Sequence, residues 1–179
     1  METFTAPRPL VANPDFPEQR RRALAGLTES MIDAPLRGIV ADFNRLPCCF
    51  TLQCCYGHFL FSGRRDPENL VPLPAIPPVK TVEYRIAYLA LCVDNTARGK
   101  QLIEALAVLP TLDPGNIQFG CADWFWERQV NSYALQVEPH RFRKEDKAVL
   151  PYGEALAIER TRDEVFRRLN MDLAGPVFL

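Results

Sequence analysis

The sequence has no long hydrophobic run and no excess of charge of one sign. No segment approaches the roughly 18–20 consecutive apolar residues of a membrane span, and the N-terminus, METFTAPRPLVANP, lacks the apolar stretch of a signal peptide. Lys and Arg total 21 against 22 Asp and Glu. The overall charge therefore offers no attraction to nucleic acid, and such a partner needs a local basic patch. We expect a cytoplasmic protein that does not contact membranes.

The signatures of several large enzyme classes are also missing. The chain contains neither the phosphate loop G-x-x-x-x-G-K-[ST] nor the dinucleotide fingerprint G-x-G-x-x-G. It has no serine nucleophile motif and no internal repeat. Only two histidines occur, His58 and His140. Chemistry that depends on an imidazole is therefore confined to two positions.

What is present is typical of one globular domain over residues 1–179, with 47% hydrophobic and 24% charged residues. Three prolines within residues 1–14 predict an extended arm. A helix is expected after Pro17, and a second helix after Asp33 and Pro35. The apolar stripe of the second helix recurs every three or four residues, at Leu36, Ile39, Val40, Phe43 and Leu46.

The next segment, CCFTLQCCYGHFLF, is rich in residues that favour strands. It predicts a β-hairpin of residues 48–54 and 58–62, with Gly57 at the bend. The five prolines of residues 67–78 exclude regular structure and predict an internal connector. Beyond it, strands are expected near 84–93, 117–121 and 133–137. Helices are expected after Asp94 or Asn95 and at a capping box formed by Thr161 and Glu164. Together these elements predict an α+β fold, a mixed β-sheet with packed helices.

The segment from Cys48 to His58 carries the strongest chemical signal. We interpret the six cysteines as reduced thiols, because adjacent cysteines are poorly spaced for disulfides. Cys55 lies three residues before His58, and an imidazolium acidifies a neighbouring thiol, so the two are the candidate catalytic pair. The alternative is that the cysteines are small buried hydrophobes.

Zinc is a rival interpretation of the same segment. Its potential ligands are sufficient in number, but adjacent cysteines on a strand point to opposite faces, so each pair offers one ligand to a shared ion. Their spacings also differ from those of structural zinc sites. We therefore expect no metal site, and a zinc-binding protein remains an alternative.

Two further groups are candidates for ligand binding. Arg64 and Arg65 could hold a phosphate, or be solvated surface charges. Trp124, Phe125 and Trp126 form an aromatic cluster that could stack on a base, or pack into the core. Of these three, Trp126 is the one included in the expected binding site.

The order of motifs resembles the N-terminal half of the tRNA wybutosine-synthesising protein 3 family. The resemblance lies in FPEQRRRALAGL and VADFNRLPCCFTLQCCYGHFLF, and is specific around residues 44–60. Asn44 and Thr51 stand at family positions, and residues 54–58 fall on a Ser-Cys-Ser-Gly-Arg signature. Cys55 and Gly57 match that signature, whereas Cys54, Tyr56 and His58 replace Ser, Ser and Arg. The second half of the chain has the family's order of elements.

The resemblance implies methylation of a tricyclic guanosine derivative in tRNA, with S-adenosylmethionine as the methyl donor. It places the site at the signature and the strand before it, with Thr51, Gln53, Tyr56 and Gly57 binding ligand around the Cys55–His58 pair. His58 cannot grip a carboxylate or phosphate bidentately as an Arg can. A shared fold with a different substrate is therefore expected as well, and so is a non-catalytic module that binds RNA or a small ligand.

Overall fold

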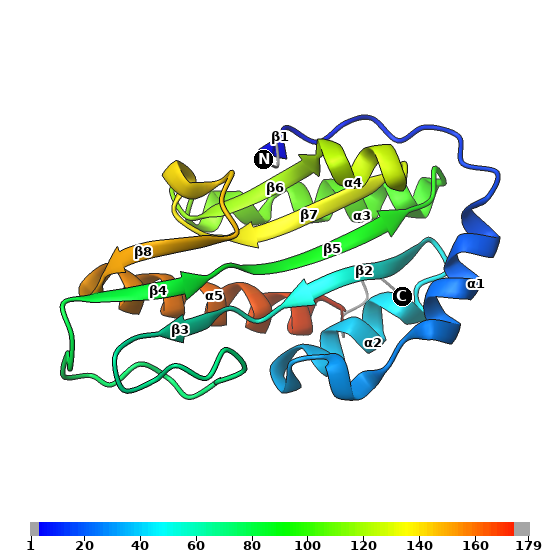
Figure 1. The fold of residues 1–179 in the computed structure, drawn as a ribbon. Coiled ribbons are helices and arrows are strands. Elements are labelled where there is room, and N and C mark those ends of the chain that lie inside the picture. The colour runs from blue at the N-terminus through cyan, green and yellow to red at the C-terminus, as the bar shows by residue number, and fades with distance from the viewer. Residues whose placement is uncertain (1–3, 174–179) are drawn as a thin grey trace.

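The chain folds into an α+β arrangement of helices and two sheets, and the described strands pair antiparallel throughout (Figure 1). The computed structural model describes residues 4–173. One sheet has the strand order β1-β6-β7-β5-β2 and the other has the order β3-β4-β8. The strands are β1 (Phe4–Thr5), β2 (Cys49–Cys55), β3 (His58–Leu60), β4 (Thr81–Arg85), β5 (Ala87–Val93), β6 (Ile117–Ala122), β7 (Ser132–Val137) and β8 (Lys147–Pro151). The α+β class was expected, but the mixed sheet was wrong, because every pairing of the described strands is antiparallel.

The expected hairpin around Gly57 is also wrong. β2 pairs with β5, and β3 pairs with β4, so the chain continues through Tyr56 and Gly57 without reversing. The reversal takes place in the connector between β3 and β4. Gly57 has φ +88°, and a Cβ there would lie 2.9 Å from Ala87 Cβ and 3.0 Å from the Tyr84 ring. Glycine is therefore required at this point for close packing and for its backbone conformation rather than for a turn.

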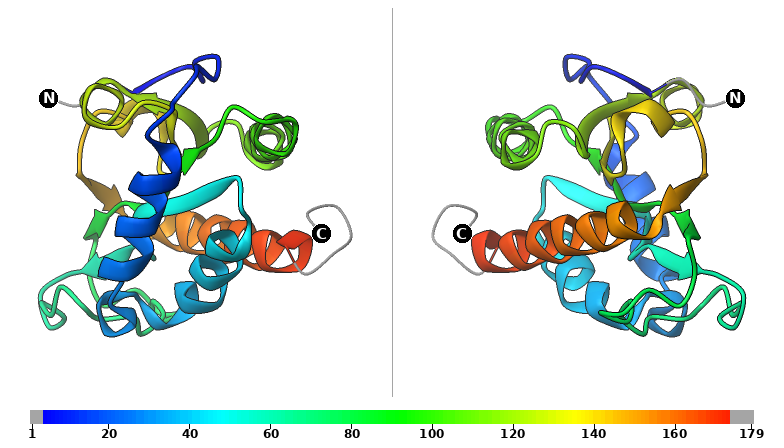
Figure 2. Two further views of the ribbon diagram at one scale, coloured as in Figure 1. Left: turned by 90° about the vertical axis from the view of Figure 1, so that its right-hand side faces the viewer. Right: turned by 90° about the vertical axis from the view of Figure 1, so that its left-hand side faces the viewer.

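Within residues 4–173, five α-helices pack around the sheets. They are α1 (Phe16–Gly26), α2 (Arg37–Arg45), α3 (Ala97–Ala107), α4 (Asp123–Arg128) and α5 (Tyr152–Leu173). In Figures 1 and 2, α3 and α5 lie behind the sheet and α4 lies in front of it. The predicted apolar stripe is buried at Leu36, just before α2, and at Ile39, Val40 and Phe43 within it, whereas Leu46, just after the helix, is half-buried. Between α1 and α4, none of the described helices covers the front of the central strands (Figure 1).

The last helix begins nine residues before the expected capping box. Tyr152, the first residue of α5, directly follows Pro151 at the end of β8, and its N–H donates to Lys80 O. Thr161 is therefore inside the helix, where its hydroxyl donates to Asp113. Tertiary contacts thus set the start of α5, and the local T-x-x-E pattern does not.

The two irregular segments are tied to the rest of the molecule. Residues 67–78 form neither helix nor strand, and Glu159 of α5 accepts the buried Leu73 N–H at 2.9 Å. The arm before α1 is held by Asn131, which exchanges hydrogen bonds with both the N–H and the carbonyl of Val11. No helix within residues 4–173 has the length and apolar character needed to cross a bilayer.

Candidate functional site

Three side chains meet at the junction of β2 and β3 and form what we call the Asp33 cluster, which comprises Asp33, Cys55 and His58. One potential ligand atom from each lies within 4.8 Å of those of the other two. His58 Nε2 is 3.4 Å from Asp33 Oδ2. Asp33 comes from the corner between two short 3₁₀ turns, η1 (Glu29–Met31) and η2 (Ala34–Leu36). The structure therefore brings the predicted pair together and adds a carboxylate.

Backbone groups fix all three members of the Asp33 cluster. The Tyr56 N–H donates to Asp33 Oδ2 at 2.7 Å, and the Gly57 N–H donates to Cys55 Sγ at 3.4 Å. His58 Nδ1 lies 3.3 Å from the carbonyl of Asn69 in the connector. With Nδ1 facing this carbonyl, Nε2 is directed at the other two side chains.

The cluster is electrostatically unusual because its charges are withdrawn from water. The His58 side chain is 5% exposed, yet its pKa is raised to about 10, first by the hydrogen bond with Asp33 and then by Cys55. Burial favours a higher pKa for Asp33, but hydrogen bonds from His58 and Tyr56 and the charge of Arg162 leave it lowered. With no other ion bound, His58 is therefore a cation at neutral pH, and it cannot act as a general base there.

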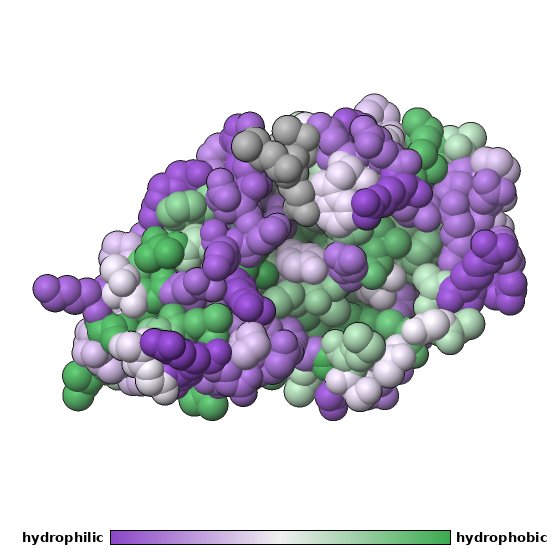
Figure 3. Space-filling model, viewed as in Figure 1, coloured by the Kyte–Doolittle hydropathy of each residue, from purple (hydrophilic) through white to green (hydrophobic). Residues whose placement is uncertain are grey.

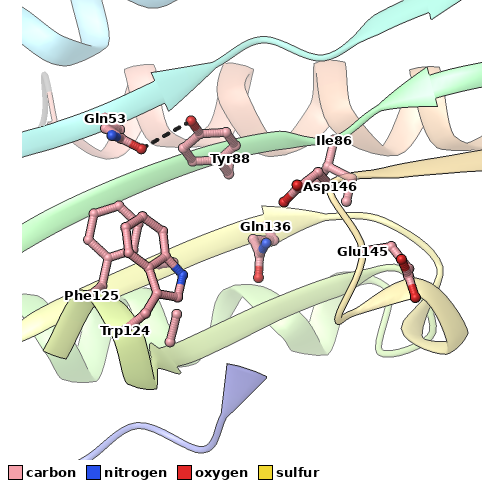
Figure 4. Close-up of a pocket in the computed structure, with 10 residues that line it drawn as sticks. Gln53, Ile86, Tyr88, Trp124, Phe125, Gln136, Glu145 and Asp146 are labelled. Carbon is pink, nitrogen blue, oxygen red and sulfur yellow. Dashed lines mark hydrogen bonds between the residues drawn. The ribbon is translucent and has the colours of Figure 1, made fainter. Parts of the chain in front are cut away.

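Two pockets adjoin on the front of the sheet and form one cleft. The first, of about 190 Å³, lies beneath α4 (Figure 4) and is lined by Gln53, Ile86, Tyr88, Ala122, Trp124, Phe125, Ala134, Gln136, Glu145 and Asp146. The second, of about 380 Å³, lies between α1 and β2 and is lined by Ala23, Gly26, Leu27, Thr28, Met31, Ile32, Val40, Thr51, Leu52, Gln53, Cys54 and Tyr88. Figure 3 shows a largely apolar hollow in the middle of this face.

Gln53 and Tyr88 line both pockets, and the Tyr88 hydroxyl donates to Gln53 Oε1 at 3.5 Å (Figure 4). Tyr88 is also the cross-strand partner of Cys55. Side chains directly opposite one another in an antiparallel pair point to the same face of the sheet. Cys55 therefore lies next to the residue at which the two pockets meet, which links the Asp33 cluster to the cleft.

The pocket beneath α4 contains two polar atoms with unmet hydrogen-bonding capacity. Among the described residues, Trp124 Nε1 and Gln136 Oε1 are buried and have no hydrogen-bond partner. In Figure 4 both side chains face the pocket, one from α4 and the other from β7. A buried donor or acceptor without a partner costs about 1–3 kcal/mol. A ligand with a matching acceptor and donor would recover that cost.

The remaining motif residues around Cys55 have distinct positions. Thr51 lines the second pocket, and its N–H donates to Asn44 Oδ1 at 2.9 Å. Tyr56 does not face the described pockets: its ring stacks on Phe166, with centroids 5.3 Å apart, and its hydroxyl donates to Asp163. Gly57 provides backbone contacts alone. Of the motif residues predicted to bind ligand, Thr51 and Gln53 are thus the ones in the cleft.

Arg64, Arg65 and Trp126 lie away from both the cleft and the cluster. Arg64 donates to the carbonyls of Val71 and Pro72 and so braces the connector. Arg65 lines a separate shallow pocket with Leu60, Phe61 and Glu83. Trp126 packs edge-on against Tyr133 beneath the Arg8 guanidinium. Of the aromatic cluster, the members in the cleft are Trp124 and Phe125.

Sequence reasoning missed Asp33, Tyr88, Gln136, Glu145 and Asp146. Asp33 was identified only as the start of a helix, and nothing local distinguishes it from a helix cap. Tyr88 and Gln136 are opposite one another in the β5–β7 register, a pairing that requires knowledge of the sheet topology. Comparisons of the chain with models of protein families, with curated proteins and with solved structures found no match.

Proposed function

We propose that the cleft binds S-adenosylmethionine beside a nucleoside of tRNA, or a free modified nucleoside, and that the protein transfers the donor's methyl group to it. The resemblance of residues 44–60 implies this reaction. The observation that supports it most is that two pockets share Gln53 and Tyr88 as a common wall. A transfer reaction requires two ligands held next to one another, and adjoining pockets meet that requirement. A cytoplasmic location belongs to the same proposal.

The pocket beneath α4 has the chemistry that an adenosyl group requires. Trp124 and Phe125 offer aromatic surface for an adenine ring. Adenine presents an acceptor ring nitrogen and a donor amino group, which match the unpaired Trp124 Nε1 and Gln136 Oε1. The neighbouring carboxylates of Glu145 and Asp146 can accept hydrogen bonds from ribose hydroxyls. The residues present therefore fit the donor.

The pocket between α1 and β2 suits the acceptor. It is the larger of the two, its walls are mainly apolar, and Thr28, Thr51 and Gln53 add polar groups. A base can bury its ring against the apolar walls while the polar groups orient it. Bound S-adenosylmethionine supplies an electrophilic methyl group. Gln53 and Tyr88, at the junction of the pockets, then hold the two ligands in line, and the Asp33 cluster places a buried cation nearby.

The direct test is a calorimetric titration with S-adenosylmethionine. We expect binding of one ligand per chain, and we expect Trp124→Phe, which keeps a ring and removes the N–H, to weaken it about tenfold. Trp126→Phe is the matched control, because that side chain lies on the same helix but outside the cleft. No heat and no thermal stabilisation at millimolar ligand would contradict the proposal, since a saturating ligand raises stability by a few kcal/mol.

Trp124→Phe should weaken ligand binding without weakening the fold. Trp124→Phe removes a buried donor that has no partner among the described residues, so the ligand-free protein should be as stable as the wild type or more stable, by up to about 1 kcal/mol. Urea denaturation without ligand measures this. Weaker binding together with a large loss of stability would mean that Trp124 acts through packing.

Binding without turnover is the second candidate, and the altered signature supports it. His58 stands where the resemblance has Arg, and a ring buried between Asp33 and Cys55 cannot clamp a phosphate. Transfer of labelled methyl groups to tRNA separates the two candidates. Labelled RNA supports the enzyme, whereas S-adenosylmethionine or tRNA binding without label supports the binding module.

A further inference from the structure

We propose that the Asp33 cluster is a zinc site, with Asp33, Cys55 and His58 as three protein ligands and a fourth position left for water or a ligand atom. This inference is independent of the proposed function. It departs from the sequence-based expectation of no metal, because Asp33 comes from a distant part of the sequence. The zinc site considered from the sequence drew its ligands from the paired cysteines of residues 48–58. The site proposed from the structure uses only Cys55 among those cysteines.

The donor atoms are chemically suitable and already close together. Carboxylate oxygen, thiolate sulfur and imidazole nitrogen are the usual zinc donors. In a tetrahedral site with normal bond lengths, neighbouring donor atoms lie about 3.3–3.6 Å apart. His58 Nε2 and Asp33 Oδ2 are separated by 3.4 Å, and Cys55 Sγ lies within 4.8 Å of both ligand atoms. Small side-chain rotations suffice to place an ion between them.

The groups around the three side chains form the outer shell that a metal site requires. A ligating histidine usually directs its other ring nitrogen at a backbone carbonyl or a carboxylate, and His58 Nδ1 faces Asn69 O at 3.3 Å. Asp33 Oδ2 accepts the Tyr56 N–H, and Cys55 Sγ accepts the Gly57 N–H. Each ligand is thus oriented by a backbone group that no side-chain substitution removes.

The number of ligands determines what the ion can do. Structural zinc sites have four protein ligands, whereas three protein ligands and an exchangeable position are typical of catalytic sites. Asp33 and Cys55 are partly exposed, so water can reach the ion from their side. On binding, the proton of the Cys55 thiol and one ring proton of His58 leave to solvent. No oxidation or reduction takes part.

Cobalt(II) titration of the metal-free whole protein is the first test. We expect one ion per chain and a thiolate-to-cobalt absorption band in the near ultraviolet, which zinc abolishes by displacement. Removing a supporting group usually costs 10–100-fold in metal affinity, so Cys55→Ser, His58→Gln and Asp33→Asn should each cost at least about 100-fold. Cys54→Ser is the matched control, since Cys54 is adjacent but outside the cluster, and it should keep the band.

Alkylation of the native protein provides a second measurement that needs no variant. Zinc should slow iodoacetamide labelling of Cys55, as followed by peptide mass spectrometry, and a chelator should restore it. Absence of the cobalt band, its persistence in Cys55→Ser, or labelling of Cys55 that ignores zinc would each overturn the site. S-adenosylmethionine binding by the metal-free protein is measured separately, so failure of either proposal leaves the other standing.

Discussion

At the scale of single residues, the Asp33 cluster depends on the charge of His58 and on the close packing at Gly57. His58 is held as a cation by Asp33 and Cys55. Gly57 brings the backbone against Ala87 and Tyr84. Both residues belong to the five-residue signature, and neither faces open solvent.

The titration of His58 predicts how stability depends on pH in the metal-free protein. Its pKa rises from the ordinary 6.5 to about 10 on folding, so the folded state binds the proton more tightly. The stabilisation is complete below about pH 6.5 and is lost as the pH rises towards 10, by a few kcal/mol at most. Urea denaturation across this range, with a chelator present, measures it. His58→Gln should flatten the profile, and an unchanged slope in that variant would assign the pH dependence to other groups.

Gly57→Ala should destabilise the protein strongly. An alanine here must adopt φ +88° and place its Cβ 2.9 Å from Ala87 Cβ, which together should cost on the order of 2–5 kcal/mol. Gly63→Ala is the matched control, because Gly63 has φ +106° but has no atom within 4 Å of its ideal Cβ. Thermal unfolding of the two variants separates backbone strain from crowding. Equal losses would mean that the contact with Ala87 is relieved at no cost.

At the scale of elements, α5 contacts the β2–β3 junction, and Arg162 is the buried cation among its contacts. Arg162 is 5% exposed and donates to Gly57 O at 3.0 Å. Its guanidinium lies 4.2 Å from the centre of the Tyr56 ring and pairs with Asp163 and Glu159. The backbone of the Asp33 cluster is thereby fixed from the helix side.

Arg162→Ala should therefore cost about 3–5 kcal/mol, because it leaves the buried Glu159 carboxylate without its countercharge and Gly57 O without its donor. Arg167→Ala on the same helix is the control. Arg167 pairs with Glu164 at the surface, and its loss should change stability little. Chemical denaturation of both variants provides the comparison, and similar losses would show that Arg162 is not a buried anchor.

The elements that the sequence predicts best are those in which local pattern and tertiary structure agree. The stripe predicted for the second helix is buried at four of its five positions, with Leu46 half-buried. At residues 123–128, DWFWER, the two disagree: the aromatic residues favour a strand, but the segment forms a short helix. β8 is a five-residue strand that ends at Pro151 and offers too little alternation to be identified. Cys55 and His58 could be paired by sequence proximity, whereas Asp33 joins them only because the η1–η2 corner packs on the edge of β2.

At the scale of the whole molecule, one pair of strand runs, 49–60 and 81–93, extends through both sheets. Each run is interrupted near the Asp33 cluster, the first at Tyr56 and Gly57 and the second at Ile86. The continuous pairing on either side of that interruption makes the intervening twenty residues one large hairpin loop. The cleft, the Asp33 cluster and the connector are thus all arranged around this one pair of antiparallel strand runs.

This arrangement has a consequence for the integrity of the chain. A cut in the connector, for example by trypsin after the exposed Arg65, separates two pieces that still share a sheet and a core. We expect the nicked protein to elute as one species in gel filtration and to split into two bands only in denaturing gels. The pieces should also reassemble when they are expressed separately, so that the protein can serve as a two-part reporter. Release of a free fragment under native conditions would show that the loop itself, rather than the ladder, joins the halves.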